Sequence, residues 1–363
     1  MSDKKKWQRA EKILCIRLDS LGDILMSTPA MRALKESHPG RRLTLLTSKS
    51  GAGIAPLIPE VDETITYDPP WMKASTPPHE SSLEFQMIDR LQHAGFDAAV
   101  IFTTFSQSPL PAALMTFLAG IPLRLAHCRE NPYYLLTDWV PETDHFDQAG
   151  IRHEVRRQLD LVASVGSRTK EEHLSLHVPP AALARINACL EQIGLDVNKP
   201  WAVLHPGSTA PSRRYPAQGF ARVARRLAAS HGWQILFTGT EPERDLIESI
   251  RETMRADSFS LAGRLGIGEF AALISKAPLL ISNNTGPVHM AAALDTPVVD
   301  LYALTNPQHT PWMVPHRTLY HDVPCKYCYK SICPLGHHNC LRLVPPEAVV
   351  EAALELLVEQ ENG

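Results

Sequence analysis

Two loops in the second half of the sequence have the composition of an anion-binding site. The first runs from His205 to Pro216 and combines small residues with the hydroxyls of Ser208 and Thr209 and the guanidinium of Arg213 or Arg214. Open backbone N–H groups and hydroxyls donate to phosphate oxygens, and an arginine binds two such oxygens at once. A solvated polar loop has the same composition, so this loop alone leaves both interpretations open.

The second such loop runs from Ser282 to His289, directly after an apolar run. Pro287 suits the first turn of a helix, where Thr285, Gly286 and His289 would then face one anionic group. The alternative is an Asn or Thr N-cap with His289 in the core. The sequence has neither a Gly-Lys-Ser/Thr ending nor a GxGxxG fingerprint, which disfavours a nucleotide hydrolase or a dinucleotide-binding enzyme.

A third loop, in the first half, offers a carboxylate. In the segment Asp19-Ser20-Leu21-Gly22-Asp23, Gly22 permits a close approach of the backbone, and Asp23 stands where a helix is expected to begin. Asp23 is a candidate general base, with Ser20 and Gly22 beside it on the acceptor side of the site. The alternative is that Asp19 or Asp23 only caps the helix.

Apolar runs and helical spacings alternate along the chain and predict the elements that position these loops. Strands are expected at Lys12–Leu18, Arg42–Thr47, Ala98–Thr103, Trp201–His205, Gln234–Thr238, Pro278–Ser282 and Pro297–Tyr302. Helices are expected at Ile24–Leu34, interrupted or restarted at Pro29 with Thr28 as N-cap, and at Leu83–Leu91, Phe220–Ala228, Gly286–Leu294 and Glu347–Val358; Tyr67–Glu80 is expected to be a surface loop. This alternation predicts an α/β fold with parallel sheets, whose ligands bind beyond the carboxyl ends of the strands.

The length of 363 residues suggests two domains. The Pro-Pro pair at 179–180 marks the boundary, which gives a first domain over residues 1–178, a second over 179–345 and a closing helix over 346–363.

Composition bears on partners and location. A formal net charge of -3 gives no electrostatic reason for nucleic-acid binding. The apolar run Leu110–Leu123 is interrupted by two prolines, which predicts a buried helix instead of a membrane span. The N-terminus carries Lys4, Lys5, Lys6, Arg9 and Lys12 but has no signal-peptide core, so the protein is expected in the cytoplasm. This basic segment is either a solvated end or a peripheral contact with anionic headgroups of the inner membrane.

Several segments together resemble one enzyme family. RLDSLGDILMSTPAMRALK from Arg17, the HPGS and SRRYP segments, and ISNNTGPVHMAAALDTPVVDLY from Ile281 are similar to glycosyltransferase family nine, the bacterial heptosyltransferases. LAGIPLR, HEVRRQLDLV and LAGRLGIGEFAALISKAPLLISNN follow in the order of that family. The resemblance implies a GT-B fold, in which two Rossmann-like domains face a central cleft, the first domain binding the acceptor and the second the nucleotide sugar.

The resemblance also implies roles for single residues. Asp23 would be the base of an inverting heptosyl transfer from ADP-heptose to a lipopolysaccharide core acceptor. The donor-binding residues would be Ser208, Thr209, Arg213, Glu243, Asn284, Thr285, Gly286 and His289. Asn284 departs from the aspartate common in the family, which leaves the donor sugar open. A base and an anion clamp suffice for this reaction, so no cofactor and no catalytic metal are expected.

Four of the seven cysteines cluster near the C-terminus: Cys325, Cys328, Cys333 and Cys340, with His337 and His338 between the last two. Their spacing is compatible with a structural zinc site, and reduced structural thiols are the favoured alternative. The similar segments PCKYC and CPLGHHNC are typical of the heptosyltransferase II branch of the family. Three other functions stay open: a family-nine enzyme for another sugar and another surface glycan, a non-catalytic nucleotide-binding module, and a metal-dependent redox or regulatory protein.

Overall fold

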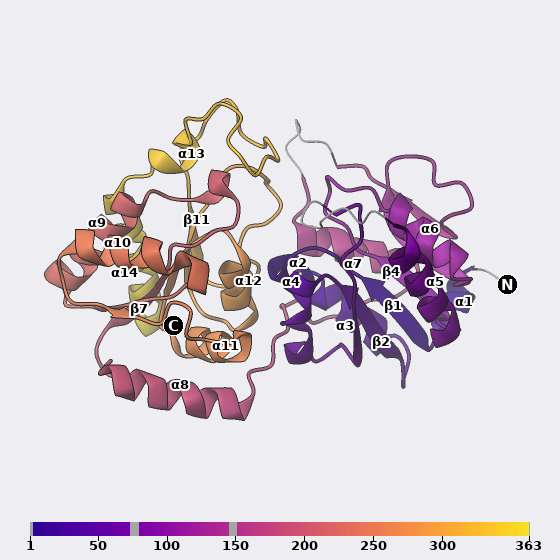
Figure 1. Ribbon diagram of the computed structural model, residues 1–363, viewed down its shortest axis with the longest axis horizontal. Coiled ribbons are helices and arrows are strands. Elements are labelled where there is room, and N and C mark those ends of the chain that lie inside the picture. Colours follow the sequence, from indigo (N-terminus) through magenta and orange to yellow (C-terminus); the bar gives the residue numbers. More distant parts are fainter. Residues whose placement is uncertain (1–2, 73–79, 145–150, 363) are drawn as a thin grey trace. The chain divides into compact units, whose positions relative to one another are not determined.

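The computed structural model describes residues 3–72, 80–144 and 151–362 and divides the chain into two compact units, Met1–Ser175 and Leu176–Gly363. Each unit contains one parallel sheet covered by helices on both faces (Figure 1). The predicted α/β class is therefore confirmed. The division falls just before the Pro-Pro pair at 179–180.

The first unit has six strands and seven helices among its described residues. The strands are β1 (Lys12–Ile16), β2 (Arg42–Thr47), β3 (Glu63–Thr66), β4 (Ala98–Ile101), β5 (Leu123–Cys128) and β6 (Asp138–Pro141). The helices are α1 (Asp3–Arg9), α2 (Leu21–Leu25), α3 (Thr28–Glu36), α4 (Lys49–Ala52), α5 (Ser82–Ala94), α6 (Leu110–Leu118) and α7 (Glu154–Ser164), with a 3-10 turn at Ala55–Leu57.

The second unit repeats this plan. Its strands are β7 (Trp201–His205), β8 (Gln234–Phe237), β9 (Phe259–Ser260), β10 (Leu280–Asn283), β11 (Val298–Leu301) and β12 (His316–Leu319). Its helices are α8 (Pro180–Ile193), α9 (Ala217–His231), α10 (Arg244–Met254), α11 (Ile267–Lys276), α12 (Gly286–Ala293), α13 (Asn339–Arg342) and α14 (Pro346–Asn362), with 3-10 turns at Pro211–Arg213 and Glu241–Glu243. The closing helix α14 packs on α9 and on the edge of the sheet at β11 and β12.

The two sheets have the same topology. The strand orders are β3-β2-β1-β4-β5-β6 and β12-β11-β10-β7-β8-β9, all parallel. In each sheet the order reverses between the first and the fourth strand of the unit, that is, between β1 and β4 and between β7 and β10. Ligands of such folds bind at this switch point, beyond the carboxyl ends of the two strands. The loops after β1, β4, β7 and β10 are therefore the places to look for a site.

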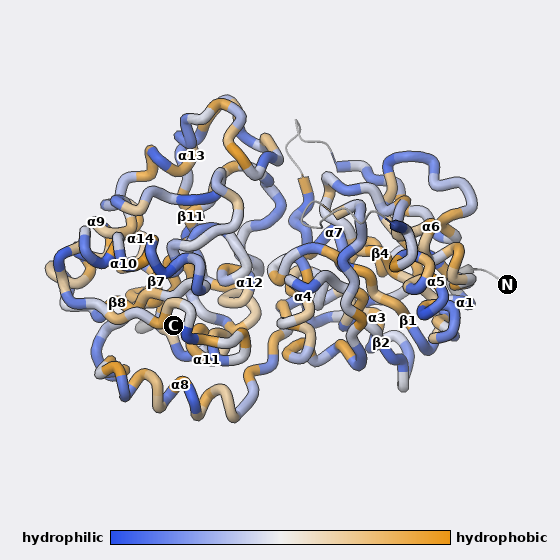
Figure 2. Tube along the Cα trace, viewed as in Figure 1, coloured by the Kyte–Doolittle hydropathy of each residue, from blue (hydrophilic) through white to orange (hydrophobic). Residues whose placement is uncertain are grey.

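Apolar side chains on both faces of each sheet form the cores. Leu14 and Ile16 of β1 pack toward α5 and α6, whereas Ile13 and Cys15, which alternate with them, are buried on the opposite face. A strand buried on both faces is mostly apolar, which is why the strands coincide with the apolar runs (Figure 2). Arg42–Thr47 and Trp201–His205 form strands over the predicted ranges, and the other predicted strands differ by a few residues at their ends.

Two details differ from the sequence predictions. The helix after β1 is interrupted and restarts, but the N-cap of α3 is Ser27 instead of Thr28, because Pro29 occupies the second helical position. The sequence predicts a buried helix α6, yet Leu114, Phe117 and Leu118 are 45%, 45% and 51% exposed. Only the opposite side of α6 packs against β4 and β5.

Part of the predicted surface loop Tyr67–Glu80 lies outside the described residues. Over the described parts of the chain, none of the helices combines the length and the apolar character that a membrane span requires.

Candidate functional site

At the switch point of the first sheet, a buried arginine gathers three carboxylates. Arg17 follows β1 directly and is fully buried. Its Nε lies 3.2 Å from Oδ2 of Asp19, and its Nη2 lies 3.3 Å from Oδ1 of Asp23 and 3.1 Å from Oε1 of Glu154. One guanidinium thus fixes the positions of two carboxylates in the loop and one on α7.

Asp23 is held at both carboxylate oxygens. Oδ1 accepts from Arg17, and Oδ2 accepts from the backbone N–H of Ser20 at 3.1 Å and from its hydroxyl at 2.6 Å. Asp23 occupies the third position of α2, so the capping interpretation describes a real contact. The Asp23 side chain nevertheless stays 14% exposed, which leaves the carboxylate within reach of a substrate hydroxyl.

Asp19 titrates differently from an ordinary aspartate. Burial raises the pKa of Asp19 to about 6, although the Arg17 guanidinium opposes the shift, and the Asp23 charge adds to it. The side-chain amide of Gln107, in the loop after β4, donates to Oδ1 of Asp19. The loops after β1 and β4 therefore meet at this carboxylate, as expected for the loops that follow two adjacent strands at the switch point.

Sequence reasoning missed the roles of Arg17, Glu154 and Gln107. Arg17 had a detectable signal, because a charged residue at the end of an apolar strand seldom becomes buried without partners. Glu154 had none, since it lies 137 residues away in sequence and meets Arg17 only in the folded unit.

At the switch point of the second sheet, Asn283 joins the two predicted anion loops. This buried side chain at the end of β10 donates through Nδ2 to the carbonyl of Pro206 at 2.7 Å and of Gly207 at 3.4 Å. Its Oδ1 accepts from the N–H of Tyr215 at 2.9 Å. The loops after β7 and β10 are thus held together at one edge of one sheet, as expected from the strand order.

Within the loop after β7, the two arginines have different tasks. Nε of Arg214 donates to the carbonyl of Ser208 at 2.8 Å and braces the loop. The half-buried guanidinium of Arg213 makes no hydrogen bond or ion pair with any residue that the structure describes. Arg213 is therefore the arginine available to an anion, with Thr209 exposed beside it and the Ser208 hydroxyl directed at the carbonyl of Ala210.

The N-terminus of α12 provides a second positively polarised group, in addition to the Arg213 guanidinium. The helix begins at Gly286, and the N-cap residue Thr285 donates its hydroxyl to the carbonyl of Asn283 at 3.2 Å. The first turn therefore presents the positive end of the helix dipole on the loop side. His289 lies in this turn and is buried, with its ring edge-on to the ring of His309 at 6.3 Å between centroids.

Glu243 lies against the loop after β7. A Cβ atom on Gly207 would come within 2.1 Å of Oε1 of Glu243, so a larger residue at position 207 would displace this carboxylate. The other oxygen of Glu243 accepts from the N–H and the hydroxyl of Thr240, at 2.8 and 2.9 Å. The carboxylate predicted to bind a ribose is therefore fixed next to the predicted diphosphate loop.

Asn284 faces the core. Its Nδ2 donates to Oδ2 of Asp300 at 3.0 Å and to the carbonyl of His309 at 2.9 Å. Burial raises the pKa of Asp300 well above its ordinary value, and the hydrogen bond from Asn284 opposes this shift. The side-chain nitrogen of Asn284 thus ties the loop after β10 to the neighbouring strand β11 and to the segment that contains His309.

The clustered cysteines surround a small cavity beside the loop after β7. Cys325, Cys328, Cys333 and Cys340 line it together with His337 and His338, and its volume of about 20 Å³ has room for one water molecule. Sγ of Cys325 lies 3.6 Å from Nε2 of His337. Among the described residues, however, no three Cys, His, Asp or Glu side chains are placed so that they could hold a metal ion.

The cysteine segment also supports the anion loop. The backbone N–H and the hydroxyl of Ser212 donate to the carbonyls of Ser331 at 3.0 Å and Lys330 at 2.7 Å. Burial opposes ionisation of Cys333, but the backbone N–H groups of residues 335–338 lower the pKa of its thiol.

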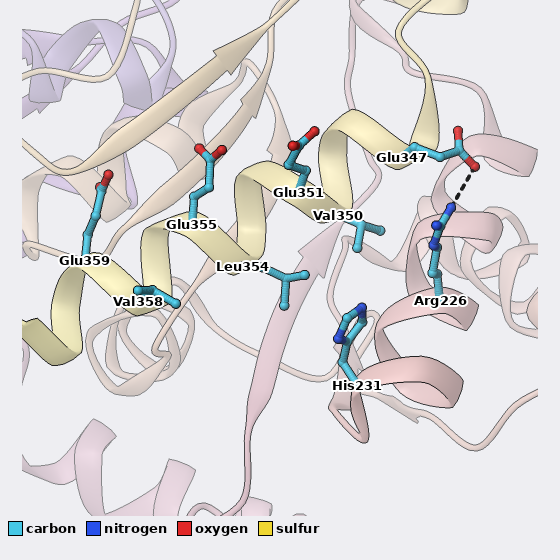
Figure 3. A pocket seen from close by; sticks show the side chains of 9 residues that line it. All are labelled: Arg226, His231, Glu347, Val350, Glu351, Leu354, Glu355, Val358 and Glu359. Carbon is cyan, nitrogen blue, oxygen red and sulfur yellow. Dashed lines mark hydrogen bonds and ion pairs between the residues drawn. The ribbon is translucent and has the colours of Figure 1, made fainter.

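An open groove elsewhere in the second unit contains none of the predicted site residues. It lies between α9 and α14 and is lined by Arg226, His231, Glu347, Val350, Glu351, Leu354, Glu355, Val358 and Glu359 (Figure 3). An ion pair of 3.1 Å between Arg226 and Glu347 joins the two helices at one end.

Comparison with known proteins identifies the family of this chain. Residues 85–338 match the model of glycosyltransferase family 9 (heptosyltransferase). The chain is 26% identical over 371 aligned positions to lipopolysaccharide heptosyltransferase 2 of Escherichia coli K12, which covers 96% of this chain and 99% of that protein.

Two solved structures share the fold over almost the whole chain. A family 9 glycosyltransferase from Veillonella parvula is 21% identical, with a TM-score of 0.78 and coverage of 96% and 97% of the two chains. The E. coli ADP-heptose lipopolysaccharide heptosyltransferase II is 23% identical, with a TM-score of 0.71 and coverage of 96% and 99%. The expected GT-B fold is confirmed by these neighbours, and the chain belongs to glycosyltransferase family 9, the heptosyltransferases.

Proposed function

We propose that this enzyme transfers a heptose from ADP-heptose to a lipopolysaccharide core acceptor, with inversion at the anomeric carbon. The relative that aligns over nearly the whole chain is named a lipopolysaccharide heptosyltransferase, and one structural neighbour is named an ADP-heptose heptosyltransferase. The observation that supports the proposal is the position of residues suited to this chemistry at the switch point of each sheet: a held carboxylate in the first unit and the two predicted anion loops in the second.

In the proposed reaction Asp23 acts as the base. Its carboxylate takes the proton of the acceptor hydroxyl while that oxygen attacks the anomeric carbon of the heptose. The bond from this carbon to the β-phosphate oxygen breaks, and ADP leaves with the electron pair. Ser20 and Arg17 keep the carboxylate in place through the contacts described above.

The second unit stabilises the leaving group in this proposal. Arg213, the hydroxyls of Ser208 and Thr209 and the first turn of α12 would meet the diphosphate, where negative charge develops as the bond breaks. Glu243 would accept the ribose hydroxyls. Domain 1–178 would therefore bind the acceptor and domain 179–345 the donor, with helix 346–363 completing the second domain.

The acceptor is a glycolipid in this proposal, so the enzyme would work at the cytoplasmic face of the membrane that carries the acceptor. A family-nine enzyme for another nucleotide sugar is the second candidate, because Asn284 stands where the family commonly has aspartate. Thermal shift with ADP-, UDP- and GDP-sugars separates the two, since the preferred donor raises the unfolding temperature most.

Replacement of the base tests the mechanism. Asp23→Asn should lower kcat on the order of 10² to 10⁴-fold, the usual contribution of a positioned base, while ADP still raises the unfolding temperature. Asp257→Asn, at an exposed aspartate of the second unit, is the matched control and should keep full turnover. Turnover by Asp23→Asn at the wild-type rate would overturn the role of Asp23.

A further inference from the structure

Helix α6 carries apolar side chains on the face that does not contact the sheet. Leu114, Phe117 and Leu118 follow the spacing of one helical face and are 45%, 45% and 51% exposed. The outer face of a helix on a globular protein is normally polar. The opposite face, with Ala112, Ala113 and Met115, already fills the core.

The loop from Arg129 to Thr137 extends this surface. Tyr133 and Tyr134 are 78% and 87% exposed, the two highest fractions among the large hydrophobic side chains of the described residues. Arg124 connects the loop to α6: its guanidinium lies 5.3 Å from the centre of the Phe117 ring, and its Nη2 donates to the carbonyl of Tyr134 at 2.9 Å. We call Leu114, Phe117, Leu118, Tyr133 and Tyr134 the apolar face.

A basic helix borders the apolar face. The indole N–H of Trp7 in α1 donates to Oδ2 of Asp138 at 2.8 Å, and the hydroxyl of Thr137, at the end of the same loop, donates to this oxygen at 2.8 Å. Helix α1 is thereby fixed beside the loop, and Figure 1 shows α1 and α6 at the same end of the first unit. Lys5, Lys6 and Arg9 of α1 are exposed.

We propose that the apolar face and the basic helix α1 together dock this protein on an anionic lipid bilayer. Tyrosine, phenylalanine and leucine side chains partition into the interface between headgroups and acyl chains, while lysines beside them are attracted by anionic headgroups. Exposed Glu11 and Glu130 reduce the positive charge of the region but do not lie on the apolar face. The core of a protein–protein interface, by contrast, is depleted of lysine, which favours lipid over a protein partner.

The position of the apolar face suits a lipid-linked acceptor. The guanidinium of Arg129, at the start of the loop, lies 3.9 Å from the centre of the Phe105 ring, in the loop after β4. Gln107 of that same loop contacts Asp19 at the predicted acceptor site. Docking at the apolar face would thus bring membrane lipid close to this site. The link between docking and the acceptor rests on the proposed function, whereas binding to a bilayer does not.

Vesicle co-sedimentation of the full-length protein tests the proposal. The wild type should bind vesicles of phosphatidylcholine and phosphatidylglycerol in equal parts, and bind vesicles of phosphatidylcholine alone much more weakly. Lys5→Gln combined with Lys6→Gln should weaken partition to the anionic vesicles about thirtyfold, because each lysine near such a surface contributes about fivefold. Tyr133→Ser combined with Tyr134→Ser, and Leu114→Ser combined with Leu118→Ser, should weaken partition to both kinds of vesicle.

Matched controls lie in the second unit. Ile332→Ser combined with Leu335→Ser removes two apolar side chains that are 71% and 64% exposed, and Lys199→Gln combined with Lys276→Gln removes two exposed charges. Both controls should bind as the wild type does.

Three outcomes would overturn the proposal. They are a wild type that binds neither vesicle, apolar-face variants that bind like the wild type, and a wild-type dimer in light scattering that Leu114→Ser with Leu118→Ser converts to a monomer. The last outcome would assign the apolar face to a second copy of the chain. Since the assay contains no donor and no acceptor, its result is independent of whether the enzyme transfers a heptose.

Discussion

Asn284 donates a hydrogen bond of 3.0 Å to the carboxyl group of Asp300, and both side chains are buried. The resemblance to the family implies an aspartate at the position of Asn284, whereas here the neighbouring strand β11 supplies a carboxyl group. The pair therefore contains one amide and one carboxyl, and burial raises the pKa of Asp300 well above its ordinary value.

Asn284→Asp should destabilise the second unit. The substitution removes the donor that satisfies Asp300 and the carbonyl of His309 and places a second carboxyl beside the first, which costs on the order of 1–3 kcal/mol. Urea unfolding at neutral pH measures the loss. The double variant with Asn284→Asp and Asp300→Asn exchanges the amide and the carboxyl group and should recover most of the stability. A double variant as unstable as Asn284→Asp alone would show that the hydrogen bond between these two side chains does not cause the loss.

Asn283→Ala should weaken donor binding without abolishing folding. The change removes the contacts that hold the loops after β7 and β10 together, namely the bonds to Pro206, Gly207 and Tyr215. Losing a buried partner costs about 1–3 kcal/mol, so the Kd for ADP should rise on the order of tenfold in calorimetry. Asn198→Ala, at an exposed position of the same unit, should leave the Kd unchanged. An Asn283→Ala variant with wild-type ADP affinity would show that the contacts of Asn283 do not contribute to donor binding.

Asp19→Asn should change how stability depends on pH. Because burial raises the pKa of folded Asp19 from 3.8 to about 6, the stability linked to its proton is complete below pH 4 and is lost as the pH rises through 6. This loss amounts to at most about 3 kcal/mol. The urea midpoint of the wild type, relative to that of Asp19→Asn, should therefore be higher at about pH 4.5 than at about pH 7. Asp257→Asn serves as control, and a difference from wild type that stays constant with pH would contradict the raised pKa.

Cys333→Ser should loosen the donor loop through the cysteine segment. The backbone of residues 335–338 lowers the pKa of the Cys333 thiol, and the carbonyls of Lys330 and Ser331 accept hydrogen bonds from Ser212. Losing about 1 kcal/mol would lower the Tm by about 2–4 °C, a change that calorimetry resolves. Cys189→Ser on α8 is the control.

Metal analysis of the same proteins bears on the alternative role of the cluster. Because no three ligand side chains of the described residues are placed to hold a metal, we expect the thiols to be reduced and the metal content to be well below one per chain. A stoichiometric metal that Cys333→Ser eliminates would contradict this prediction and assign the four cysteines as ligands.

The sequence by itself determined the class of fold, since strands buried on both faces of a parallel sheet are mostly apolar, and short apolar runs such as Trp201–His205 alternate with helical spacings along the chain. It also indicated which loops carry chemistry, because small residues, hydroxyls and arginines after a strand are a local pattern. Short edge strands such as His316–Leu319 were missed, because an edge strand buries too little surface to require an apolar run.

Only the tertiary structure decided which residues meet. Arg17 and Glu154 form an ion pair across 137 positions of sequence, and Asn283 joins two loops that are 77 residues apart at its contact with Pro206. The structure also showed that one face of α6 is exposed although its sequence is apolar except for Thr116. The physical reason is the same in each case: partner identity and burial depend on which strands lie side by side, and local sequence does not contain that information.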